Sequence, residues 1–159
     1  MIESNFKDKK ICITGGAGFI GSAIANRLFG IAEITIVDSL IPEYGGNLHN
    51  IEKIKDHIKF DIADVREKDV IENLVKDMDY IFNMAGQTSH MDSMTDPHTD
   101  LEINARAQLS ILEAIRQHNP KVKIIFASTR QIYGRPDNLP VDESHPIRPV
   151  DVNGINKNA

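Results

Sequence analysis

The sequence has one cysteine, no tryptophan, no long hydrophobic run and no excess of positive charge. The single thiol, Cys12, excludes an internal disulfide, and its place in an apolar stretch favours a buried packing role. The net charge of -5 at pH 7 argues against a nucleic-acid partner, which requires a basic face. Because no signal peptide and no segment of membrane-spanning length are present, we expect no membrane partner and a cytoplasmic location.

The chain does contain a regular alternation of apolar stretches and amphipathic stretches. Strands are predicted at 11–14, 34–38, 57–60, 80–83 and 122–127. Near-continuous apolar strands that alternate with helices are typical of a parallel sheet covered on both faces, so the predicted fold class is α/β. The length of 159 residues suits one domain, 1–159, with a core of its own.

Helical spacing of apolar residues predicts the elements between these strands. A first helix is expected to bury Ile20, Ala23, Ile24 and Leu28, and a short helix is expected near 48–55. Asp64 is predicted to cap a helix that carries Val70, Ile71, Leu74 and Val75. A long helix at 97–118 is expected to bury one face, made of Leu101, Ala105, Leu109, Leu112 and Ile115.

The most informative motif lies between the first strand and the first helix. Gly15, Gly18 and Gly21 follow a G-x-x-G-x-x-G spacing. In this context the first glycine makes the tight turn off the strand, the second lets the backbone approach a pyrophosphate, and the third lets the helix lie close to the sheet. The N–H groups of the helix N-terminus then face the phosphates. The motif predicts a Rossmann-type, doubly wound sheet that binds a dinucleotide.

Asp38 ends the second predicted strand, 17 residues after Gly21. A carboxylate there accepts both hydroxyls of the adenosine ribose and repels a 2′-phosphate, and no arginine directly follows it. This favours NAD over NADP as the cofactor. The alternative is a solvated acid at a strand end.

Other polar or small residues follow the remaining strands, where ligands collect in open α/β sheets. Asp61 with Ile62 is well placed for the adenine edge, although a capping or turn aspartate fits the spacing nearly as well. Small Ala85 and Gly86 let the backbone approach the middle of the cofactor, as a plain tight turn also would. After the fifth strand, the hydroxyls of Ser128 and Thr129 compete as donors to a substrate oxygen.

Together these motifs resemble the extended short-chain dehydrogenase/reductase superfamily. The specific branch is the NAD-dependent nucleotide-sugar epimerases and dehydratases, of UDP-glucose 4-epimerase-like type. The resemblance runs from Lys9 onward and implies a cofactor site and a reacting-oxygen donor, Thr129. It assigns the pyrophosphate to Phe19 and Ile20, the ribose to Asp38 and Ser39, the adenine to Asp61 and Ile62, and the nicotinamide side to Ala85, Gly86 and Gln87.

The branch also carries a Tyr-x-x-x-Lys signature, from which this chain departs. Lys157 matches the lysine that binds the nicotinamide ribose, but Asn153 stands where the catalytic tyrosine is expected. An amide donates and accepts hydrogen bonds but does not serve as a general base near neutral pH. The catalytic positions implied by the resemblance are therefore Thr129, Asn153 and Lys157, with the usual proton acceptor replaced.

The length is the second departure, because the family continues into a C-terminal domain that binds the nucleotide sugar. We therefore expect an incomplete NAD-binding domain that lacks the substrate domain, and a homodimer weakened by the truncation. The fifth strand is expected to be an exposed edge of the sheet. No metal is expected, because His90, His98 and His118 do not fall at metal-ligand spacing with a third ligand.

The leading hypothesis is the NAD-binding part of a nucleotide-sugar epimerase that acts by transient hydride transfer from the sugar to NAD. Dehydration is disfavoured, because Arg130 and Gln131 stand where the related 4,6-dehydratases carry an acidic pair. An alternative is that the chain is a relative of the UDP-glucuronate decarboxylases or the 2-epimerases, and this alternative stays open. So do a non-catalytic dinucleotide-binding sensor, favoured by Asn153, and an inert fragment.

Overall fold

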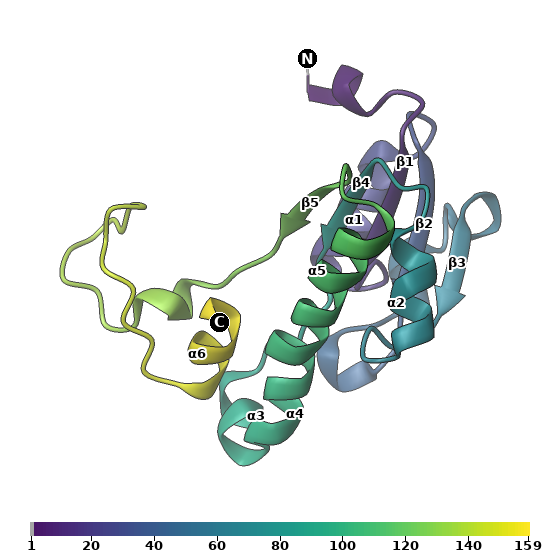
Figure 1. Cartoon of the computed structure of the whole chain (residues 1–159). Coiled ribbons are helices and arrows are strands. Elements are labelled where there is room, and N and C mark those ends of the chain that lie inside the picture. Colours follow the sequence, from purple (N-terminus) through teal and green to yellow (C-terminus); the bar gives the residue numbers. More distant parts are fainter. Residues whose placement is uncertain (1) are drawn as a thin grey trace.

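The computed structural model describes residues 2–159 and contains one sheet of five parallel strands (Figure 1). Across the sheet these are β3 (Lys59–Ile62), β2 (Glu33–Asp38), β1 (Lys10–Thr14), β4 (Tyr80–Asn83) and β5 (Lys123–Phe126). The chain builds outward from β1 to β3 and then crosses to β4 on the other side of β1, which creates a topological switch point. The doubly wound prediction is confirmed, and β5 is an edge strand as expected.

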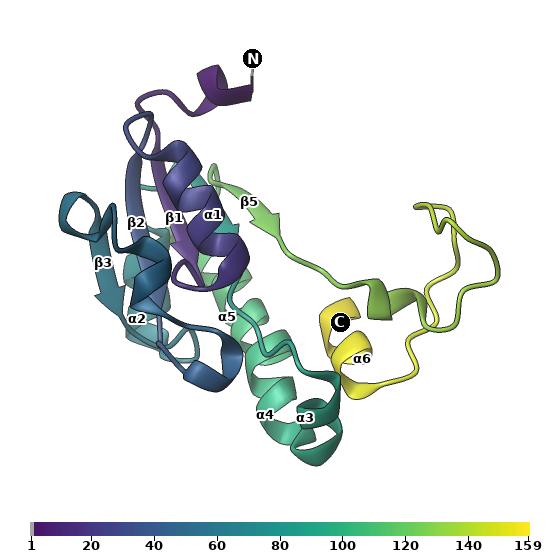
Figure 2. The ribbon, with the colours of Figure 1, turned by 180° about the vertical axis from the view of Figure 1, so that it is seen from behind.

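Helices cover both faces of the sheet. α1 (Phe19–Leu28) lies on one face, whereas α2 (Lys68–Val75) and α5 (Ala107–His118) lie on the other (Figures 1 and 2). Ile11 and Ile13 of β1 belong to the core under α1, and Cys12 between them belongs to the core under α2 and α5. Because successive side chains of a strand point to opposite faces, this one buried strand serves both cores. Cys12 is fully buried, as predicted.

The third strand starts later than its apolar pattern suggests. The pattern predicts 57–60 and the strand is found at Lys59–Ile62, so Asp61 and Ile62 end the strand instead of following it. They pair with Val37 and Asp38 of β2, which continues that far and supplies the backbone partners. The helix expected near 48–55 is replaced by two 3₁₀ turns, Leu48–Ile51 and Lys55–His57.

Asp64 does not cap α2, so this expectation is also wrong. The helix follows Glu67, and no side chain caps it. The Asp64 carboxylate instead accepts a hydrogen bond from the Arg66 backbone N–H at 2.8 Å and pairs with its guanidinium at 2.6 Å. The hydrogen bond from the Arg66 side chain lowers the pKa of Asp64. The acid therefore closes the turn before the helix.

The helix expected at 97–118 is present, but the prediction of its buried face is wrong. A π-helical turn, Glu102–Arg106, joins α4 (Pro97–Leu101) to α5. Leu109 is 68% exposed and Leu112 is 51% exposed. Polar residues turn inward in their place because partners across the fold satisfy them, and the buried face consists of Ile103, Asn104, Ala107, Gln108, Ile111 and Ala114.

The inward face of α1 also differs from the apolar pattern. Ile20 is 59% exposed and Ala23 is exposed as well. Ile20 lies in the first turn of α1, directly after the glycine loop, and lines a cavity instead of packing in the core. The buried residues of this helix are Gly21, Ser22, Ala25 and Leu28.

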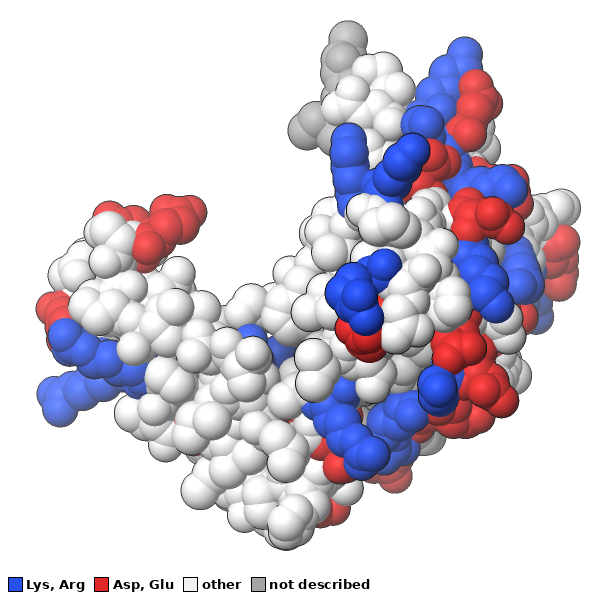
Figure 3. Space-filling model, viewed as in Figure 1, with Lys and Arg blue, Asp and Glu red and all other residues white. Residues whose placement is uncertain are grey.

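Beyond β5 the chain leaves the sheet and returns as α6 (Val152–Asn158), which packs against α3 (His90–Thr95), α4 and the 3₁₀ turn Arg130–Tyr133 (Figures 1 and 2). Charged side chains gather over the sheet and its covering helices, whereas the surface near α3 and α6 carries few (Figure 3). No helix within residues 2–159 is long and apolar enough to cross a bilayer.

Candidate functional site

A cavity of about 480 Å³ opens at the carboxyl ends of β1, β2 and β4, beside the topological switch point. Its size is in the range of small-molecule and cofactor sites. The structure brings most of the expected cofactor residues to its wall. These are Gly15, Gly18, Phe19, Ile20, Gly21, Asp38, Ser39, Ala85 and Gly86.

The glycines of the motif are required by close backbone contacts. Gly15 has a φ of +65°, and a Cβ there would lie 2.8 Å from the Ala85 backbone nitrogen. A Cβ on Gly21 would overlap the carbonyl oxygen of Gly15. At Gly18 the nearest atom, the same oxygen, would be 3.2 Å away, so this position is far less crowded. The absence of a side chain at Gly15 and Gly21 therefore lets β1, β4 and α1 lie close together, whereas Gly18 leaves its side of the cavity open.

Asp38 is fixed at the cavity wall by two backbone N–H groups. Its Oδ2 accepts from Ala17 N at 2.9 Å, and its Oδ1 accepts from Leu40 N at 2.9 Å. The residue is only 8% exposed, and it also lines the cavity. Each carboxylate oxygen retains a further lone pair, so the group is oriented and still able to accept from hydroxyls of a ligand.

Asp61 and Ile62 lie outside the cavity wall, and their expected contact with adenine stays a prediction. Asp61 pairs with Lys59 at 3.1 Å, and Ile62 is 66% exposed. The wall next to β3 is formed by the residues that follow, 63–65. The sequence reasoning also missed the loop 41–46 as part of the wall, although its Pro42, Gly45 and Gly46 mark it as a loop.

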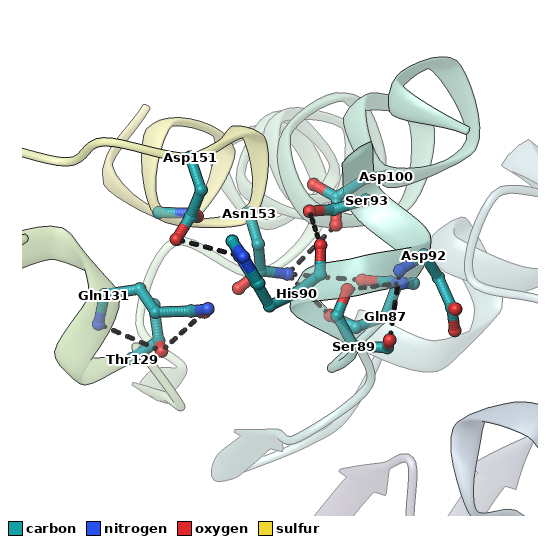
Figure 4. Close-up of polar contacts among 11 residues, drawn as sticks. Gln87, Ser89, His90, Asp92, Ser93, Asp100, Thr129, Gln131, Asp151 and Asn153 are labelled. Carbon is teal, nitrogen blue, oxygen red and sulfur yellow. Dashed lines mark hydrogen bonds and ion pairs between the residues drawn. The ribbon is translucent and has the colours of Figure 1, made fainter. Parts of the chain in front are cut away.

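A buried carboxylate, Asp100, organises the region between α4 and α6 (Figure 4). Its Oδ1 accepts from Asn156 Nδ2 at 2.7 Å, and its Oδ2 accepts from Asn104 and Asn153 Nδ2 at 2.9 Å each. Asn153 Nδ2 is also 3.0 Å from the Gln87 carbonyl oxygen. Asn153 is thus 2% exposed and held by hydrogen bonds, in the place where the resemblance puts a tyrosine. Sequence reasoning missed Asp100, although it shares a helix face with Asn104.

Lys157 does not line the cavity itself, but its side chain contacts Ala127, which does. Its Nζ lies 3.3 Å from the Ala127 carbonyl oxygen and 5.1 Å from the centre of the Phe126 ring. Burial lowers the pKa of this ammonium, and the Asp100 carboxylate acts in the other direction. A Cβ on Gly86 would stand 2.7 Å from Nζ and 2.9 Å from Asn104 Oδ1. A side chain at this position would therefore require the ends of Lys157 and Asn104 to shift.

Two other expected site residues lie near the cavity but not in its wall. Thr129 caps the turn Arg130–Tyr133, where its Oγ1 accepts from Gln131 N at 3.3 Å (Figure 4). Gln87 is 1% exposed, and its side chain donates to the Ser89 carbonyl oxygen at 2.9 Å. Ser128, the competing hydroxyl, is exposed. The roles expected for Thr129 and Gln87 stay predictions.

A family model described as GDP-mannose 4,6 dehydratase matches residues 12–159. The chain belongs to this family. It is therefore a member of the NAD-dependent epimerase/dehydratase branch of the short-chain dehydrogenases/reductases, as the resemblance predicted. A putative UDP-glucose 4-epimerase of Methanocaldococcus jannaschii is 38% identical over 150 residues, which are 92% of this chain and 47% of that protein.

Solved structures of epimerases also resemble the chain over about half of their length. One is a UDP-N-acetylglucosamine 4-epimerase from Methanobrevibacter ruminantium in complex with UDP-N-acetylmuramic acid. Its TM-score is 0.87 at 31% identity, and the match covers 96% of this chain and 48% of that one. Another is the UDP-glucose 4-epimerase of Thermus thermophilus in complex with NAD, with a TM-score of 0.79 at 33% identity over 93% and 47% of the two chains. The chain thus spans about half the length of these relatives.

Proposed function

We propose that residues 1–159 are the NAD-binding part of a nucleotide-sugar epimerase. The observation that carries this proposal is the cavity at the switch point, whose wall joins the glycine loop to the buried carboxylate of Asp38. A loop at a helix N-terminus suits phosphates, and an oriented carboxylate on the second strand suits ribose hydroxyls. The similar epimerase of Thermus thermophilus, which is in complex with NAD, supports the same cofactor.

The residues present fit the cofactor, because Gly15 and Gly21 leave no room for side chains and Asp38 keeps lone pairs for a ligand. Gly18, Phe19 and Ile20 would then hold the pyrophosphate. When bound, NAD would supply the acceptor for a hydride taken from a sugar carbon and returned to the opposite face. The remaining assignments are Asp38 and Ser39 for the adenosine ribose, Asp61 and Ile62 for adenine, Ala85, Gly86 and Gln87 for the nicotinamide side, and Lys157 for the nicotinamide ribose.

Within this proposal, Thr129 polarises the reacting oxygen of the sugar. The binding site for the nucleotide-sugar substrate would be completed by a part of the protein that corresponds to the second half of the relatives. Asn153 favours a second candidate, a dinucleotide-binding protein without turnover, because its amide is locked in hydrogen bonds and does not accept a proton.

Two measurements test the proposal. In calorimetry of this chain, we expect NAD to bind more than tenfold tighter than NADP, since the Asp38 carboxylate repels a 2′-phosphate. In a protein that includes this chain and a substrate-binding half, we expect UDP-glucose to be converted to UDP-galactose. Stoichiometric NAD without any turnover of UDP-sugars supports the non-catalytic candidate, and the absence of NAD binding overturns both.

A further inference from the structure

In the proposed epimerase reaction, a side chain other than Asn153 has to accept the proton of the sugar hydroxyl. Asn153 has its amide nitrogen committed to Asp100 and Gln87, and an amide oxygen does not take up a proton near neutral pH. A substitute has to be titratable, accessible from the open side of the site, and held in one orientation. An imidazole is the side chain whose ordinary pKa lies nearest to neutrality.

His90 meets these requirements. It is the first residue of α3, two positions after Thr88 of the cavity wall, and its side chain is 51% exposed. α6 packs against both α3 and the turn Arg130–Tyr133, which brings His90 to the same region as Thr129. Figure 4 shows the imidazole between Asn153 and the Thr129–Gln131 segment. His90 therefore lies next to the position that the tyrosine would have occupied.

Asp151 orients this imidazole. Its Oδ2 lies 3.2 Å from His90 Nδ1, while its Oδ1 accepts from the Gly154 backbone N–H at 2.6 Å and so caps α6. The carboxylate is 8% exposed, so the helix cap and burial fix its position. A carboxylate at Nδ1 selects the tautomer that carries its proton there, which leaves the Nε2 lone pair free as an acceptor.

We propose that His90, oriented by Asp151, is the catalytic base that replaces the tyrosine in the epimerase reaction. This rests on the proposed function. The O–H bond of the sugar hydroxyl breaks and its proton moves to His90 Nε2. The electron pair left on oxygen becomes the second carbon–oxygen bond of the transient ketone, while the hydride on that carbon leaves for the acceptor named above. The reverse transfers restore the alcohol with inverted configuration, so no net oxidant is consumed.

Other ionisable groups on the elements packed against α3 are less suitable. Lys157 on α6 is turned to the Ala127 carbonyl oxygen and the Phe126 ring, and Asp100 is fully buried among amides. Asp96 and His98 lie at the exposed start of α4, and Asp92 lies on α3 itself. Among the described residues on these elements, only His90 combines exposure with a fixed carboxylate partner.

Two measurements test the proposal: the tautomer of His90 in this chain, and the kcat of a protein that converts UDP-glucose. In ¹⁵N spectra of the chain at alkaline pH, we expect His90 to carry its proton on Nδ1, and we expect Asp151→Ala to abolish that preference. Asp151→Asn, which keeps a helix cap, serves as the variant that preserves the fold. A wild-type His90 that is protonated on Nε2, or that shows no preference, overturns the proposal.

In the protein that turns over UDP-glucose, His90→Gln is expected to lower kcat by about 10²–10⁴-fold, the usual contribution of a general base. The matched control is His98→Gln, an exposed histidine on α4, which should leave kcat unchanged. NAD content should be unchanged in both. Full activity of His90→Gln alongside an active wild type overturns the role of His90 and leaves the proposed function intact. An inactive wild type with bound NAD counts against the proposed function, and the tautomer then still decides whether His90 is poised as an acceptor.

Discussion

The buried carboxylate of Asp100 supports a quantitative prediction about stability. Replacing it with asparagine keeps the shape of the side chain but exchanges one acceptor oxygen for an NH₂ group. If the NH₂ takes the place of Oδ1, it confronts the Nδ2 donor of Asn156, and if it takes the place of Oδ2, it confronts those of Asn104 and Asn153. In either orientation at least one buried donor loses its acceptor, and the remaining hydrogen bonds lose their charge.

Re-orientation of a neighbour does not remove this cost. Asn104 Oδ1 is buried without a hydrogen-bond partner and would suit the new NH₂ group. However, turning the Asn104 amide to offer Oδ1 takes its Nδ2 away from the Gln87 carbonyl oxygen, to which it donates at 2.9 Å. One hydrogen bond is then exchanged for another. A hydrogen bond to a charged group contributes about 1.5–3 kcal/mol, so we expect Asp100→Asn to cost about 2–4 kcal/mol.

Urea denaturation at constant pH measures this effect. With a slope of about 1–3 kcal/mol per molar urea, the expected loss moves the midpoint by roughly 1–2 M. This is a large share of the free energy of unfolding of a typical domain, about 5–15 kcal/mol. The control is Asp92→Asn, at an exposed position on α3, for which we expect a change within about 0.5 kcal/mol. An Asp100→Asn midpoint equal to that of the control would refute the role of the carboxylate as an organising group.

Three further predictions follow from contacts in the fold. Gly21→Ala should destabilise the chain by about 1–3 kcal/mol in urea, because its Cβ overlaps backbone, whereas Gly18→Ala should keep near-normal stability and weaken NAD binding in calorimetry. Burial raises the pKa of Cys12 to about 12, so iodoacetamide at pH 8 should modify it only after unfolding, and rapid reaction of the folded chain would contradict its burial. The exposed Leu109 and Leu112 should drive self-association of the chain, which Leu109→Lys with Leu112→Lys should abolish in sedimentation, and a monomeric wild type would exclude this contact.

The sheet was predictable because its information is local. Each apolar strand can be recognised from its own residues, and the three glycines of the motif lie within seven consecutive residues. The switch point and the cavity could therefore be predicted from the sequence. The predictions are wrong where contacts with residues far away in the sequence determine the bounds of a strand or the buried face of a helix. Lys59–Ile62 is a strand because β2 continues to Asp38 beside it. On α5, apolar periodicity selected Leu109, yet Gln108 is the buried residue since it bonds to Asn83 across the fold.

The contacts around Asn153 could not be predicted from the sequence. Asp100 and Asn104 are four residues apart on one helical face, and Asn153 and Asn156 are three residues apart on another, so each pair is visible in the sequence. That the two pairs meet is not visible, because about fifty residues and the sheet edge lie between them and nothing local encodes their contact. The contact between the two pairs gives Asn153 a structural role. It donates to a carboxylate that three amides share, at 2% exposure, so a tyrosine placed there would take away the amide that donates to Asp100. Asn153 is therefore better explained as part of the Asp100 network than as a defective catalytic residue, and the proposed proton acceptor, His90, lies on the neighbouring helix α3.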